Sequence, residues 1–175
     1  MEQEKNNVSL DTLGNQEAGR WVSIVQIQMK RTDKSLCGVG ALNSPAAVKD
    51  MVQPIFDMSD REVFAVLSLD AKLFPVEFEV VAVGGIGHCI VDVPNIFKHA
   101  ILSNASHVLC IHNHPSGDPT PSTEDLQITK RIKLAGDLLG ISLIDHIVIG
   151  ADTYYSFKER GNLRTRRVRQ YDYRI

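Results

Sequence analysis

Apolar residues recur along this chain with two different spacings, and segments of the two kinds alternate. Short apolar runs rich in Val, Ile and Phe are typical of β-strands, and they occupy residues 21–29, 62–70, 73–84, 107–111, 141–150 and 153–157. The run at 107–111 is apolar except for His107, as expected of a strand buried at the centre of a sheet. The turn after Asp70 predicts that the strands on either side of it form an antiparallel hairpin.

Three other segments carry the spacing of an amphipathic helix, at residues 44–56, 94–105 and 122–140. Ser44 followed by Pro45 is typical of a helix start, and Pro54 is expected to end that helix or to mark its last turn. Gly140 is placed to end the third helix in a left-handed conformation. Strands alternating with helices over 175 residues predict one α/β domain.

Composition and charge narrow the class of protein further. The net charge is −2, and no apolar run approaches the roughly 18 residues that a membrane span needs. The first residues are polar, without the charged and then apolar pattern of a signal peptide, so a cytoplasmic location is expected. The three cysteines, Cys37, Cys89 and Cys110, form no CxxC pair, which favours free thiols over disulfides.

The two ends of the chain differ in charge from its centre. Residues 1–19 are polar and predict a flexible N-terminal segment, residues 20–161 the folded domain, and residues 162–175 a basic C-terminal tail. From residue 158 to 175 there are seven basic and two acidic side chains. A solvated tail is the favoured interpretation, and a weak contact with nucleic acid or an acidic partner is the alternative.

The stretch HNHPSGDPTPSTED, residues 112–125, concentrates the chemistry of the chain. His112 and His114 are two residues apart, so at the end of a strand both imidazoles can point to the same side. Asp125 falls in the first turn of the next helix, from which it can face the same point. Two imidazoles and a carboxylate are three ligands of a tetrahedral zinc site, and a catalytic zinc keeps the fourth position for water.

Simpler interpretations of the same residues remain open. Ser122 and Asp125 have the spacing of an N-terminal capping box, a structural role that is compatible with metal binding. Glu124 is an alternative ligand by its chemistry, but it lies about 100° around the helix from Asp125. Most HxH pairs taken alone are ordinary surface or core histidines.

The spacing H-x-H-x7-S-x2-D resembles the JAMM signature of JAB/MPN-domain metalloproteases, and Glu62 matches the upstream glutamate of that signature. The segments HNHPSGDPTPSTEDLQITKRI, LGISLIDHIVIG and YYSFKERG resemble, more narrowly, the RadC family. The resemblance extends from about residue 22 to Gly161. Longer RadC proteins carry a helix-hairpin-helix-like segment ahead of this domain, and this chain is expected to be a short form without it.

The resemblance implies a zinc-dependent hydrolase of the metallopeptidase or isopeptidase type, acting on a peptide or an isopeptide-linked protein. His112, His114 and Asp125 would bind Zn²⁺. Glu62 would act as general base on the zinc-bound water, and Ser122 would donate a hydrogen bond to the oxyanion. The fold would be the cytidine-deaminase-like α/β arrangement, a mixed sheet flanked by helices. Deamination is not expected, since nucleobase deaminases use H-x-E with P-C-x-x-C, and neither occurs here.

Two other functions stay open from the sequence. One is a DNA-repair-associated role on or near DNA, which the RadC resemblance and the basic tail raise together. The other is a non-catalytic interaction module, although MPN domains of that kind generally lose ligands that this chain keeps. Asp145 and His146 are left with two interpretations, either as residues that orient a metal ligand or as an ordinary pair on a strand.

Overall fold

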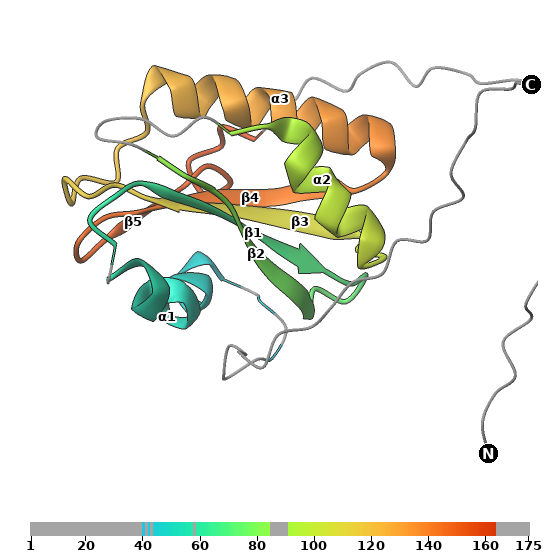
Figure 1. Ribbon diagram of the computed structural model, residues 1–175, viewed down its shortest axis with the longest axis horizontal. Helices are drawn as coiled ribbons and strands as arrows, with labels where there is room; N and C mark the ends of the chain where they lie inside the picture. Colours follow the sequence, from blue (N-terminus) through green and yellow to red (C-terminus); the bar gives the residue numbers. More distant parts are fainter. Residues whose placement is uncertain (1–39, 41, 43, 58, 85–90, 164–175) are drawn as a thin grey trace, which may run out of the picture.

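The computed structural model describes residues 40, 42, 44–57, 59–84 and 91–163. They form three layers, with a mixed sheet between one helix on one face and two helices on the other (Figure 1). The α/β architecture expected from the sequence is therefore confirmed. The strand expected at 21–29, the segment 1–19 and most of the basic tail lie outside the described residues. None of the described helices is long and apolar enough to cross a membrane.

The sheet has five strands in the order β2-β1-β3-β4-β5. Their bounds are β1 Val63–Leu69, β2 Pro75–Val83, β3 His107–Asn113, β4 Ser142–Ile149 and β5 Tyr154–Ser156. The pair β1 and β2 is antiparallel, as the predicted hairpin requires, and β1 also pairs antiparallel with β3. The single parallel pair joins β3 to β4 across the helix between them, and β5 returns antiparallel to β4.

The three helices cover the two faces of the sheet. Helix α1 (Pro45–Phe56) packs its buried residues on one face, while α2 (Val93–Leu102) and α3 (Thr123–Leu139) pack on the other (Figure 1). Helix α1 starts at its Ser44 cap and contains Pro54 in its last turn, as predicted. Helix α3 ends at Gly140 with φ of 73°, the left-handed conformation predicted for that residue.

Several elements differ in extent from the prediction, and two of the differences have a clear cause. Strand β3 continues to Asn113 instead of ending at residue 111, because His112 still pairs with Phe64 of β1 and with Val148 of β4. Helix α2 stops at Leu102, three residues earlier than predicted, and the chain turns at Asn104 with φ of 54°. The first difference matters for the site, because it makes His112 part of the central strand.

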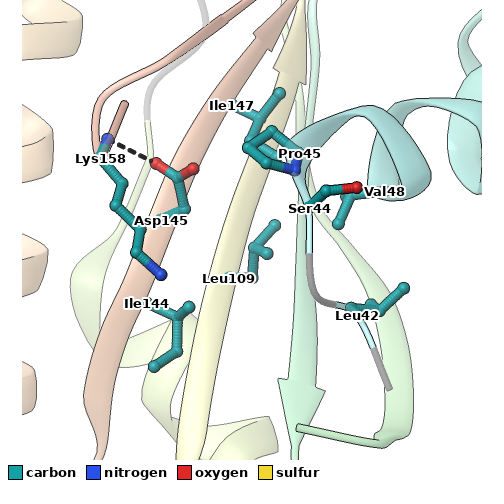
Figure 2. A pocket seen from close by; sticks show the side chains of 9 residues that line it. All are labelled: Leu42, Ser44, Pro45, Val48, Leu109, Ile144, Asp145, Ile147 and Lys158. Atoms are coloured by element: carbon teal, nitrogen blue, oxygen red, sulfur yellow. Dashed lines mark hydrogen bonds between the residues drawn. The ribbon is translucent and has the colours of Figure 1, made fainter. Parts of the chain in front are cut away.

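A bulge in β4 decides which way Asp145 and His146 point. The register between β3 and β4 shifts by one residue at Ile144, since Val108 pairs with Leu143 and Leu109 with Asp145. Such a bulge re-aims the side chains that follow it. Asp145 consequently faces α1, beside Leu109 and Ile147 (Figure 2), and His146 faces the opposite side of the sheet.

Asp145 is a structural residue of the α1 face. Its carboxylate accepts hydrogen bonds from the Ser156 hydroxyl and the backbone N–H of His146, at 2.5 and 2.7 Å. It also accepts from the backbone N–H of Lys158 at 2.9 Å (Figure 2). Burial raises the pKa of this carboxyl, and the three donors oppose that rise. Asp145 therefore fastens the short strand β5 and the turn after it to β4.

Candidate metal centre

Four side chains from three separate segments meet at one end of the sheet. Glu62 precedes β1, His112 and His114 lie at the end of β3, and Asp125 lies in the first turn of α3. Each offers a ligand atom, and the four atoms lie within 4.8 Å of one another. In Figure 1 this is the left edge, where β1 begins, β3 ends and α3 begins. The structure thus brings together the residues that the sequence pattern selected as metal ligands and general base.

The distances between the ligand atoms suit a tetrahedral ion. His112 Nε2 lies 3.1 Å from His114 Nε2 and 3.2 Å from Asp125 Oδ1, and His114 Nε2 lies 3.5 Å from Asp125 Oδ2. Metal bonds of about 2.0–2.2 Å at tetrahedral angles place neighbouring ligands about 3.3–3.6 Å apart. The spacing of the three side chains is therefore compatible with one metal ion held between them.

The loop after β3 fixes the imidazole of His114. The backbone N–H of His114 donates to Ile149 O of β4 at 2.9 Å, which continues the ladder one residue past the strand. Its ring Nδ1 lies 2.8 Å from the Asp118 carbonyl oxygen, which can only accept, so Nδ1 carries a proton and Nε2 faces the cluster. The hydrogen bond to Asp125 is the main cause that raises the pKa of His114.

The carboxylate of Asp125 contacts both Ser122 and the two histidines. Its Oδ2 accepts from the backbone N–H and the hydroxyl of Ser122, both at 2.7 Å, while Ser122 Oγ accepts from Asp125 N at 3.1 Å. This is the expected capping box, and it leaves Oδ1 facing His112. Burial alone would raise the pKa of this carboxyl, but the facing imidazoles and Ser122 outweigh burial and hold it well below its usual range.

The alternative ligand and the expected oxyanion donor can be placed as well. Glu124 is exposed and is not a member of the cluster, in agreement with its position around the helix from Asp125. The Ser122 hydroxyl donates its hydrogen bond to Asp125 in this structure, so a role for Ser122 at the oxyanion stays a prediction.

Asn113 holds Glu62 in place, a contact that the sequence did not reveal. The Asn113 side chain is 5% exposed, accepts from the backbone N–H of Val63 at 2.8 Å and donates to Arg61 O at 3.1 Å. It therefore clamps the residues on both sides of Glu62. A further backbone bond, from Gly84 N to Glu62 O at 2.7 Å, ties this segment to the end of β2. A polar residue between two histidines looks like a loop former in the sequence, because its partner is about 50 residues away.

We expect the substitution Asn113→Ala to destabilise the fold while leaving zinc binding intact. The change leaves the Val63 N–H and the Arg61 carbonyl without their hydrogen-bond partner. A buried polar group without a partner lowers the stability by about 1–3 kcal/mol. The backbone of His112 and His114 stays in the ladder to β4. Urea denaturation and zinc titration of the same preparation measure both quantities. Lost zinc binding in a folded Asn113→Ala protein would show that the asparagine supports the metal ligands as well as Glu62.

A second group of potential ligands lies on the sheet away from this cluster. His99 of α2 lies 3.4 Å from a Glu77 carboxylate oxygen and 4.0 Å from one of Glu79, both on β2. These half-buried contacts make the group a necessary control in any metal measurement.

Fold and cluster together define a class of protein: an α/β domain with a candidate His/His/Asp metal site at the end of a mixed sheet. Compared with known protein families, residues 42–162 match the RadC-like JAB domain. The chain therefore belongs to the RadC-like JAB family, which confirms the resemblance seen in its sequence.

Three curated relatives illustrate the similarity, all carrying the name UPF0758 protein. The one from Syntrophomonas wolfei is 40% identical over 145 residues, which cover 83% of this chain and 59% of the relative. The Desulfitobacterium hafniense relative is 41% identical over 122 residues, 70% of this chain and 54% of that protein. The Thermotoga maritima relative is 45% identical over 104 residues, which cover 59% of this chain and 47% of that protein. The chain thus spans about half the length of these relatives.

Proposed function

We propose that this domain is a zinc-dependent hydrolase of peptide or isopeptide bonds. The observation that carries the proposal is the cluster itself: two imidazoles and a carboxylate with metal-ligand spacing, and a second carboxylate, Glu62, within reach of the same point. Structural zinc sites use four protein ligands, whereas catalytic sites use three and keep a position open. The donor set here is of the second kind if Glu62 acts as a base.

The donor chemistry fits zinc better than a hard cation. Ca²⁺ and Mg²⁺ prefer six or more oxygen ligands, whereas two of the three close ligands here are imidazole nitrogens. When bound, zinc supplies a Lewis acid that polarises a carbonyl and lowers the pKa of water to about 7.

Glu62 is placed to move the proton that hydrolysis requires. Its side chain is half-buried, and the clamp by Asn113 fixes the backbone on either side of it. In the proposed reaction the Glu62 carboxylate accepts a proton from the attacking water and delivers it to the leaving amine nitrogen. His112, His114 and Asp125 hold the metal, and Ser122 would assist at the oxyanion after giving up its bond to Asp125.

An extended peptide is the substrate class that the surroundings of Glu62 favour. Among the strands that the structure describes, β2 lies at one end of the sheet, and its last residue, Val83, pairs with Val63 directly beside Glu62. The Val83 side chain is 59% exposed. An open strand edge can bind an extended chain by adding it as a further strand. A peptide bound along β2 would pass close to Glu62, the proposed base, where it extends beyond the end of this strand.

A cleavage screen tests this function. Zinc-loaded protein would be incubated with linear peptides and with isopeptide-linked peptides, and products would be identified by mass spectrometry. We expect cleavage that stops on chelation and returns when zinc is added back. Absence of any cleavage across both panels by protein with one bound zinc per chain would favour the non-catalytic alternative.

A further inference from the structure

The imidazole of His112 makes a second contact, on the side away from the cluster. His112 Nδ1 lies 2.8 Å from His146 Nε2, and both side chains are fully buried. Their ring centroids are 4.8 Å apart. Phe64 stacks on His112 at 5.8 Å, and Phe157 stacks on His146 at 4.9 Å. Each imidazole is thus packed against a phenylalanine ring.

Thr129 holds the far nitrogen of His146. Its hydroxyl oxygen lies 2.6 Å from His146 Nδ1 and donates to the carbonyl oxygen of Asp125, one helical turn earlier. A carbonyl oxygen can only accept, and a hydroxyl has one proton to give. The Thr129 hydroxyl must therefore accept from His146, so the proton of His146 sits on Nδ1.

The position of the proton on His146 decides where His112 carries its own proton. In the neutral tautomer that the Thr129 contact selects, His146 Nδ1 carries the proton and Nε2 carries the lone pair, so Nε2 is an acceptor. The hydrogen bond between the rings then requires a proton on His112 Nδ1. His112 Nε2 is left to face His114 and Asp125 with its lone pair.

We propose that Thr129 and His146 are positioning residues that fix the tautomer of His112, so that Nε2 is held ready to bind the metal. The inference rests on the proposed zinc site and adds two residues to it. Thr129 lies on α3, which also carries the proposed ligand Asp125, and His146 lies on β4, which carries none of the proposed ligands. The bulge at Ile144 is part of the device, because it turns His146 toward His112. These hydrogen bonds also link Asp125 to His112. Thr129 donates to the backbone carbonyl of Asp125 and contacts His146, and His146 contacts the ring of His112.

Nitrogen NMR of the histidine rings tests the proton positions without any activity assay. In metal-free protein labelled with ¹⁵N we expect His146 to be protonated at Nδ1 and His112 to carry a proton at Nδ1. After zinc addition both Nδ1 protons stay and the His112 Nε2 resonance shifts. A proton on His146 Nε2, or a His112 ring protonated only at Nε2, would overturn the proposal.

Zinc affinity of matched variants tests the consequence. Thr129→Val keeps the shape of the side chain and removes the hydroxyl, and His146→Leu removes the acceptor for His112. We expect each to weaken zinc binding about 10- to 100-fold, the usual effect of losing a residue that orients a ligand. Thr129→Ser, which restores the hydroxyl, should recover most of the affinity. If the two residues act as one chain, the double variant is no weaker than His146→Leu alone.

Ser156→Ala is the control for loss of a buried hydroxyl. Its hydroxyl donates to Asp145 on the opposite face of the sheet, so we expect reduced stability and unchanged zinc affinity. Wild-type zinc affinity in folded Thr129→Val and His146→Leu proteins would reject the positioning role and leave the zinc site standing. Wild-type protein that binds no zinc would instead reject the proposed function itself.

Discussion

Glu62→Gln should retain bound zinc and lose hydrolysis by about 10²- to 10⁴-fold, the usual contribution of a positioned general base. Glutamine keeps the length and most of the hydrogen bonding of glutamate but cannot accept the proton. The backbone around residue 62 is held by Asn113 and Gly84, and these contacts do not involve the Glu62 carboxylate. The measurement is kcat for the best substrate of the screen, with zinc content determined on the same samples.

Glu124→Gln is the matched control for this substitution. Glu124 is an exposed carboxylate next to Asp125 in sequence and lies outside the cluster, so its removal changes the local charge by the same amount. We expect its kcat to stay within a few-fold of wild type. Full activity in zinc-loaded Glu62→Gln protein would remove Glu62 from the mechanism, and an equal loss in both variants would reduce its role to general electrostatics.

Asp125→Ala should lose zinc and also weaken the start of α3. The variant removes a ligand, so we expect zinc affinity to fall by more than the roughly 100-fold upper range for supporting residues. It also removes the acceptor for the Ser122 N–H, and one lost capping bond costs about 1 kcal/mol. Zinc titration and thermal unfolding of metal-free protein separate the two effects.

Ser44→Ala is the matched control, because it removes a capping hydrogen bond from a helix that is not part of the site. Ser44 caps α1 by accepting from Ala47 N at 3.2 Å. We expect a comparable loss of stability, with zinc affinity as in wild type. If zinc affinity falls equally in the Ser44 and Asp125 variants, the effect of Asp125 is one of helix stability and its assignment as a ligand fails.

The sequence was sufficient for the elements whose signals are local. The Ser44-Pro45 start of α1, the stop of α3 at Gly140 and the Ser122–Asp125 capping box all depend on residues within one turn, and the structure shows each of them. The ends of β3 and α2 were less well predicted. Strand β3 runs on to Asn113 because neighbouring strands pair with it, and pairing across the sheet leaves no local signal.

The site shows the same division between local and distant information. His112, His114 and Asp125 fall within one short stretch with metal-ligand spacing, whereas Glu62 was matched only through the family signature. The contacts of Asn113 with Arg61 and Val63, and of Thr129 with His146, join segments 17 or more positions apart. The direction of His146 depends on a one-residue bulge in β4, and alternation along the strand could not reveal it.

Counting zinc per chain in wild type and in the double variant His112→Ala/His114→Ala is the most direct test of the central claim. His99→Ala is measured alongside them, because His99 with Glu77 and Glu79 is the other group able to hold an ion among the described residues. The account predicts about one zinc per chain in wild type and in His99→Ala, and none in a folded double variant. One zinc per chain in the double variant, lost only when His99 is replaced, would contradict it.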